Sequence, residues 1–122
     1  MIGYVTLGTN DLPRAAAFYD ALLGELGARR LWEFERGIAW GVAADRPSLG
    51  ILKPFDGHAA TVGNGVMVAL VAVSREQVDR VHARAIELGG KDEGPVGLRG
   101  GNFYAGYFRD LDGNKLNVFC HG

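Results

Sequence analysis

The stretch Tyr4 to Gly24, YVTLGTNDLPRAAAFYDALLG, is the clearest indication of the fold, because an apolar strand in it leads directly into a helix. Asp11 has a side chain suited to capping a helix that begins at Leu12-Pro13. Apolar residues then recur with helical spacing until Gly27, where the helix is expected to end. The sequence therefore predicts one strand, over residues 2–9, and one helix.

The same order of residues returns 63 positions later in the chain. Since 67 − 4 = 63 and 74 − 11 = 63, one shift superimposes Tyr4 on Met67 and Asp11 on Ser74. Ser74 and Gln77 have the spacing of a capping box, and the apolar pattern after them continues to a glycine pair at 89–90. A strand is expected over residues 65–73 before this second helix. The chain is interpreted as a diverged internal duplication.

Short apolar stretches follow each helix, and glycine, at 19 of 122 residues, provides many tight turns between them. The strands expected in these stretches cover residues 30–34, 38–43 and 49–53 in the first half, and 104–109 and 115–120 in the second. Residues 91–102 are poor in β-formers, so an irregular strand or a loop is expected there. The fold class is α+β, with two tandem β-α-β-β-β modules in one domain: residues 1–55, a linker at 56–64, and residues 65–122.

Composition excludes several classes of function. Thirteen basic and fourteen acidic residues give 13 − 14 = −1, so nothing favours binding to nucleic acid. No apolar run has the length of a membrane span, and the start has no signal-peptide pattern. A single cysteine, Cys120, leaves no intrachain disulfide, which agrees with the cytoplasm.

Two stretches resemble a known family. The opening strand and helix, Tyr4 to Gly24, and the hairpin RDLDGNKLNVF, Arg109 to Phe119, are similar to the vicinal oxygen chelate superfamily of glyoxalase I, bleomycin-resistance proteins and extradiol dioxygenases. The resemblance implies two modules whose strands curl into a curved open cleft, commonly completed by a second copy as a homodimer. It is less specific for activity, because this fold hosts many chemistries.

Metal-using members of the superfamily carry His and Glu ligands on the first and last strands of each module. Carried over onto this chain, the resemblance places the four positions at Tyr4, Leu52, Met67 and Asn117. A phenol, an alkyl group, a thioether and an amide are poor ligands for a divalent metal. No metal and no other cofactor is therefore expected, and Asn117 either bonds an organic ligand or is a polar residue facing a wet cleft.

Several aromatic and polar residues fall on, or close to, cleft-facing positions if the family geometry holds. These candidate ligand-binding residues are Tyr4, Trp40, Leu52, Met67, Tyr104, Tyr107 and Asn117. As a group they suit a flat, partly apolar small molecule. The alternative is that they only fill the concave face of the sheet.

Three functions compete. The first is a metal-independent binder of a small organic molecule, similar to the bleomycin-resistance branch, acting as a homodimer. The second is a glyoxalase- or dioxygenase-like enzyme, with a non-standard metal site at His58, His82 or His121, or with acid–base chemistry by Tyr4, Glu33 or Glu35. The third is a degenerate partner subunit without a ligand.

Overall fold

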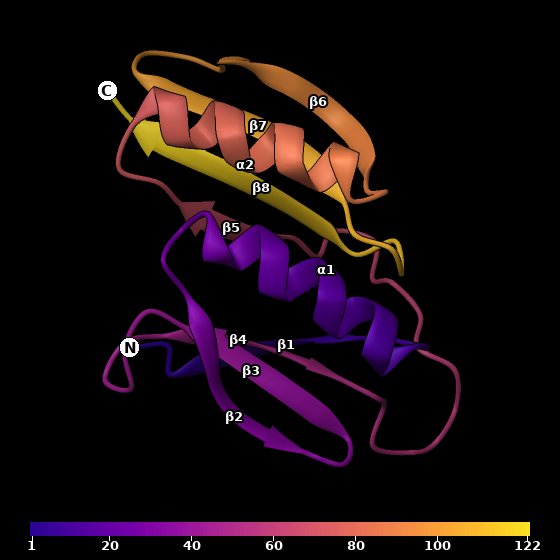
Figure 1. The fold of residues 1–122 in the computed structure, drawn as a ribbon. Helices are drawn as coiled ribbons and strands as arrows, with labels where there is room; N and C mark the ends of the chain where they lie inside the picture. The colour runs from indigo at the N-terminus through magenta and orange to yellow at the C-terminus, as the bar shows by residue number, and fades with distance from the viewer. The chain divides into compact units, whose positions relative to one another are not determined.

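The computed structural model describes all residues, 1–122, and separates into two compact units, Met1–Val62 and Gly63–Gly122. Each unit contains one helix and one four-stranded sheet (Figure 1). Neither helix has the length and apolar character needed to cross a membrane.

The first unit has the order strand, helix, three strands. Its elements are β1 (Tyr4–Gly8), α1 (Leu12–Gly24), β2 (Arg29–Phe34), β3 (Gly37–Gly41) and β4 (Ser48–Leu52). The strands lie in the order β1-β4-β3-β2, with β1 parallel to β4 and the other pairs antiparallel.

The second unit repeats this arrangement. Its elements are β5 (Val68–Val71), α2 (Arg75–Glu87), β6 (Lys91–Leu98), β7 (Phe103–Arg109) and β8 (Lys115–His121), and its sheet has the order β5-β8-β7-β6. The two helices have equal length and begin 75 − 12 = 63 residues apart. The predicted α+β fold with two β-α-β-β-β modules is therefore confirmed.

Both helices begin at side-chain caps, as the sequence predicts. The carboxylate of Asp11 accepts a hydrogen bond from the backbone N–H of Arg14 at 3.1 Å. The hydroxyl of Ser74 accepts one from the N–H of Gln77 at 3.1 Å, and the Gln77 side chain in turn accepts from the N–H of Val73 at 2.8 Å. The bonds to Asp11 and Ser74 satisfy amide donors that the first helical turn leaves unpaired, and the bond to Gln77 pairs the N–H of Val73, which precedes the cap.

Each helix covers one face of its sheet and buries an apolar stripe against it. Phe18, Tyr19 and Leu22 of α1 are buried in this way, as are Val78 and Val81 of α2, which Figure 1 shows across β7 and β8. We call the other side of each sheet its open face. Side chains alternate between the two sides along a strand, so the strand pairings determine which residues reach an open face.

The residues from Lys91 onward form an irregular strand, the first of the two possibilities that the sequence predicts. The pairing of β6 with β7 shifts register between Asp92 and Gly94 and again between Gly94 and Gly97. The predicted turn after β7 is also present: Asp110 accepts the N–H of Asn114 at 2.9 Å, and Gly113 has a φ of 90°.

Candidate functional site: the open faces and an adjoining cavity

The open face of the first sheet carries an exposed aromatic group made of Tyr4, Trp32 and Phe34. The Tyr4 and Trp32 rings meet edge to face with centroids 6.4 Å apart, and the Trp32 and Phe34 rings lie 5.4 Å apart. Tyr4 is 63% exposed, Trp32 37% and Phe34 47%. Leu52, half-buried, lies on the same face because β1 pairs with β4 in register. We call the rings of Tyr4, Trp32 and Phe34 the aromatic group.

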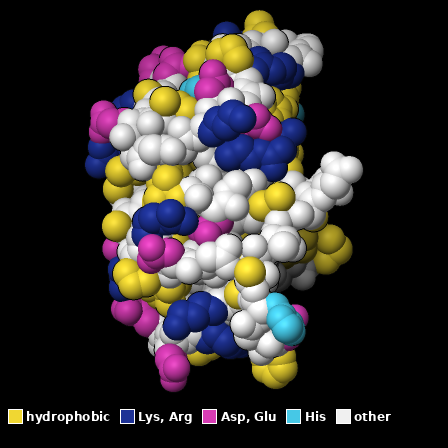
Figure 2. Space-filling model, turned by 90° about the vertical axis from the view of Figure 1, so that its right-hand side faces the viewer, with side chains coloured by type: hydrophobic (Ala, Val, Ile, Leu, Met, Phe, Trp, Pro, Cys, Tyr) yellow, Lys and Arg dark blue, Asp and Glu magenta, His cyan; other side chains and the backbone are white.

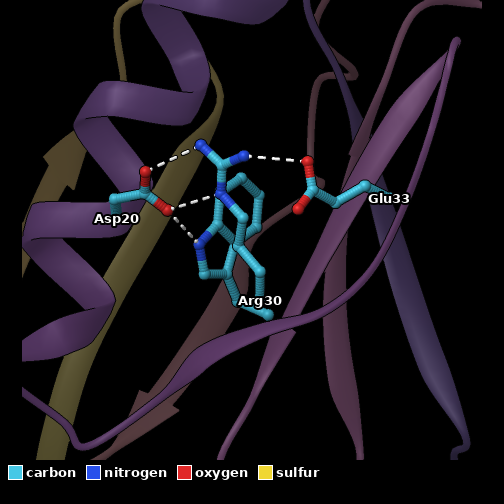
Figure 3. A network of polar contacts seen from close by, with 4 residues as sticks. Asp20, Arg30 and Glu33 are labelled. Atoms are coloured by element: carbon cyan, nitrogen blue, oxygen red, sulfur yellow. Dashed lines mark hydrogen bonds and ion pairs between the residues drawn. The ribbon is translucent and has the colours of Figure 1, made fainter.

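Trp40 does not belong to this face, so its predicted place in the cleft is wrong. It is 1% exposed, packs against Tyr19 of α1, and donates its indole N–H to Asp20 at 2.9 Å. Asp20 also accepts two hydrogen bonds from Arg30, which reaches Glu33 as well (Figure 3). Trp40 therefore belongs to the contact between α1 and the sheet.

The Asp20 carboxylate is the centre of this contact. The hydrogen bond from Arg30 lowers the pKa of Asp20, against the opposing effect of partial burial, and the Trp40 indole lowers it further. The same carboxylate raises the pKa of Arg30. Glu33, considered above as an acid–base group, is committed to Arg30 at 3.0 Å.

The open face of the second sheet has Asn117 at its centre. Strand pairing places Asn117 beside Ala69 of β5 and Tyr107 of β7. Asn117 is 2% exposed, and its side-chain oxygen has no hydrogen-bond partner. A buried acceptor without a partner costs about 1–3 kcal/mol.

Two cationic side chains lie over the ring of Tyr107, the residue that pairs with Asn117. The guanidinium of Arg99 lies 5.4 Å from the centroid of the Tyr107 ring, and the ammonium of Lys115 lies 5.6 Å from it. Further along the same face, the rings of Phe103 and Phe119 are stacked 5.2 Å apart. This face therefore combines apolar rings with two positive charges.

Tyr104 does not reach the open face, so its predicted place there is also wrong. Its hydroxyl donates to Asp79 of α2 at 2.6 Å, and Arg75 of the same helix lies over its ring. The bond to Asp79 is the main reason that the pKa of Tyr104 is raised. Tyr104 holds α2 on its sheet.

The fourth of the mapped metal positions also needs correction. Val5 pairs with Leu49 and Val68 with Leu116, and Val5 and Val68 are 63 residues apart. The residue equivalent to Asn117 is therefore Gly50, not Leu52. The alignment slips because β6, with eight residues and two register shifts, is longer than β2, with six.

The donor set at these positions does not fit a divalent metal ion. Tyr4 supplies a phenol, Gly50 no side chain, and Asn117 an amide, while Met67, which lies just before β5, supplies a thioether. The structure contains no group of three or more His, Cys, Asp or Glu side chains placed to hold a metal ion.

The three histidines have separate environments. His82 of α2 is buried, with its Nε2 3.3 Å from Asp92 and 3.1 Å from the carbonyl oxygen of Tyr107. His121 packs against Phe103 and Phe119. His58 is exposed and lines a cavity of about 610 Å³ in the first unit, together with Glu35.

That cavity lies beside the tip of the β2–β3 hairpin. Arg36 and Lys53 line it together with Phe34 and Phe55. The face of the molecule in Figure 2 carries charges of both signs with hydrophobic side chains between them. This agrees with the net charge of −1.

Sequence reasoning missed Trp32, Phe34 and Arg36. The alternation of Trp32 and Phe34 along β2 is a signal that they share a face, but a register shift between Arg30 and Trp32 hides which face it is. Nothing in the sequence marks Arg36, because Lys53 and Phe55 come near it only through the pairing of β3 with β4.

Comparisons with known proteins agree with this architecture. Residues 1–118 match the glyoxalase/bleomycin resistance protein/dioxygenase superfamily. The crystal structure of a glyoxalase/bleomycin resistance protein from Albidiferax ferrireducens T118 is 38% identical, with a TM-score of 0.92, over 100% of this chain and 99% of that chain. The chain belongs to the glyoxalase/bleomycin resistance protein/dioxygenase superfamily.

More distant structures share the fold alone. A lactoylglutathione lyase from Agrobacterium tumefaciens is 20% identical with a TM-score of 0.70, over 98% of this chain and 92% of that chain. The fosfomycin resistance protein FosX from Listeria monocytogenes is 20% identical with a TM-score of 0.74, over 100% and 93%. No curated protein matches this chain.

Proposed function

We propose that this protein binds a small, partly apolar organic molecule without a divalent metal ion, as a homodimer in the cytoplasm. The observation that carries the proposal is the donor set at the positions where metal-using relatives hold their ion. Tyr4, Gly50, Met67 and Asn117 offer neither a carboxylate nor an imidazole. A catalytic metal generally needs three such protein ligands and one open position.

The aromatic group supports an apolar ligand. Its rings offer flat, exposed surfaces on which a planar molecule can stack, and small-molecule sites are typically lined by such side chains. The unpartnered oxygen of Asn117 supports a ligand that donates a hydrogen bond, because the bond would remove the cost of a buried acceptor. Tyr107 and Met67 remain proposed contacts on the second unit.

Binding of 2-naphthamide to EDTA-treated protein, measured by calorimetry, tests the proposal. We expect binding that EDTA leaves unchanged and that Tyr4→Ala and Trp32→Ala each weaken about tenfold, since each removes an aromatic contact. Val42→Ala is the matched control, because Val42 is exposed after β3 and is not part of the aromatic group. Binding that EDTA abolishes and one equivalent of zinc or manganese restores would contradict the proposal.

A second function is favoured by one observation, namely that Glu35 and His58 line the same cavity. Carboxylate and imidazole are common general acids and bases, so metal-free acid–base catalysis is the alternative. Turnover of thiol–aldehyde adducts or catechols that survives EDTA, and that Glu35→Gln and His58→Asn each abolish, would favour it. Binding without turnover would favour the first function.

A further inference from the structure

The side chain of Arg36 is held in place at the tip of the β2–β3 hairpin. Its Nη1 donates to the carbonyl oxygen of Lys53 at 3.0 Å. The guanidinium carbon lies 5.5 Å from the centroid of the Phe34 ring and 5.3 Å from that of Phe55. Stacking on two rings and one hydrogen bond orient the planar fork, and its other N–H groups remain as donors for an acceptor.

A second cation, Lys53, lines the same cavity. Glu35 is the one carboxylate among the residues that line it, so positive charge exceeds negative charge there. In a concave site, such an excess acts on a ligand more strongly than the same charges on a flat, fully solvated surface.

Hydrogen bonds fix the walls of this cavity before any ligand arrives. The Asn10 side chain accepts the N–H of Ala60 at 2.7 Å and donates to the carbonyl oxygen of Ala60 at 3.1 Å. The N–H of Lys53 donates to the carbonyl oxygen of Arg36 at 2.8 Å. The segment after β4 is thereby tied to the β1–α1 connection and to the hairpin tip, which lowers the cost of ordering on binding.

The cavity continues into the open face of the first sheet. Phe34 lines it and also belongs to the aromatic group. An adjacent cavity of about 420 Å³ shares Arg36 and Lys53 and extends to Thr6 and Leu52, two open-face residues. It is also lined by Asp56, whose carboxylate accepts the backbone N–H of His58 at 3.0 Å. A molecule stacked on Trp32 and Phe34 can therefore extend to both cations within one unit.

We infer that the ligand of the first unit is an organic acid, with a flat apolar body on Trp32 and Phe34 and a carboxylate held by Arg36 and Lys53. A guanidinium fork matches the two oxygens of a carboxylate, and Lys53 adds a point charge beside it. This inference rests on the proposed small-molecule binding and narrows the ligand to one charge class.

The test compares 2-naphthoate with 2-naphthamide, which share the ring system and differ in charge. We expect the wild-type protein to bind the acid about tenfold more tightly than the amide. Added salt should lower the affinity for the acid and leave the affinity for the amide unchanged. Lys53→Gln should lower affinity for the acid severalfold and leave the amide unchanged. Lys53 suits this substitution because its side chain is exposed and the structure shows no bond from its ammonium group.

Arg36→Lys provides a second variant, which keeps the positive charge but removes the planar guanidinium fork. It should also lower the affinity for 2-naphthoate and leave the affinity for 2-naphthamide unchanged. Arg46→Gln, an exposed arginine outside both cavities, is the control with the same charge change as Lys53→Gln. Equal affinity of the wild-type protein for acid and amide would overturn this inference and leave the proposed function standing. If the wild-type protein bound neither probe, both this inference and the proposed function would be contradicted. If Lys53→Gln and Arg46→Gln lost equal affinity for 2-naphthoate, the preference for the acid would come from the overall charge of the protein, which would also overturn the inference.

Discussion

At the scale of single residues, Asn117 allows stability and the proposed ligand binding to be tested separately. Its side-chain oxygen is buried without a partner, so an apolar side chain of similar size removes a desolvation cost. We expect Asn117→Leu to leave the free energy of unfolding unchanged or raise it by about 1 kcal/mol, measured by urea denaturation. The same variant should lose affinity for ligands that donate a hydrogen bond.

Asn114 is the matched control, because it is a buried asparagine whose side chain has a hydrogen-bond partner within the chain. Its side chain donates to Asp110 at 2.9 Å, and its backbone N–H donates to the same carboxyl group. Asn114→Leu should therefore lower the free energy of unfolding by about 1–3 kcal/mol. If Asn117→Leu and Asn114→Leu lowered the free energy of unfolding equally, the Asn117 side chain would have hydrogen-bond partners in solution, contrary to this expectation.

The two tryptophans give a second prediction at this scale. Trp32 is exposed on the open face and Trp40 is buried beside α1, so a bound aromatic molecule should change the emission of Trp32. In fluorescence titrations with 2-naphthamide, Trp40→Phe should keep the response and Trp32→Phe should lose most of it. The opposite result would move the binding surface away from the aromatic group.

Sequence reasoning placed Trp40 and Tyr104 incorrectly for an identifiable physical reason. All five residues of β3 are buried, so its sequence GIAWG shows no alternation that would indicate which side Trp40 faces. Tyr104 is oriented by a hydrogen bond to Asp79, which lies 25 residues earlier in the chain. Such contacts exist only after the helices have packed on their sheets.

At the scale of elements, both helices could be predicted closely, because caps and apolar periodicity are local signals. The register of the strands could not be predicted from the sequence. The extra residues and two register shifts of β6 displace the second repeat relative to the first, which moved the position equivalent to Asn117 from Leu52 to Gly50. A sequence shift of 63 is therefore reliable for the helices and fails after them.

The contact of α1 with its sheet depends on pH through Asp20. Arg30 lowers the pKa of Asp20 in the folded chain, so this carboxylate contributes stability above its unfolded pKa of about 4, and the contribution disappears as pH falls through the lower folded value. Both side chains are more than a third exposed, so the contribution is about 0.5 kcal/mol. Asp20→Asn should lower the free energy of unfolding by this amount at neutral pH. Below pH 4, the free energy of unfolding of the variant should fall less steeply than that of the wild-type protein.

Urea denaturation at a series of pH values measures this effect. Asp45→Asn, which removes an exposed charge in the β3–β4 loop, should keep the wild-type pH dependence. If Asp20→Asn and the wild-type protein lost stability in parallel below pH 4, the ion pair with Arg30 would contribute nothing in solution.

At the scale of the whole molecule, two units of the same topology account for the chain, and each sheet keeps one helix-free face and two edge strands. In the second sheet β5 is an edge strand, and Val71 on it is 70% exposed. Unpaired edges and exposed apolar side chains favour association, and closed two-fold pairing is the commonest form that association takes.

We therefore expect the protein to sediment at micromolar concentration with twice the 13.1 kDa mass of one chain. Val71→Lys should shift the equilibrium toward the single chain, because a charge on an edge strand opposes pairing. Val42→Lys introduces the same charge at another exposed valine and should leave the mass unchanged. A wild-type mass of 13.1 kDa would contradict the homodimer, whereas a dimer that tolerates Val71→Lys would show that β5 lies outside the interface.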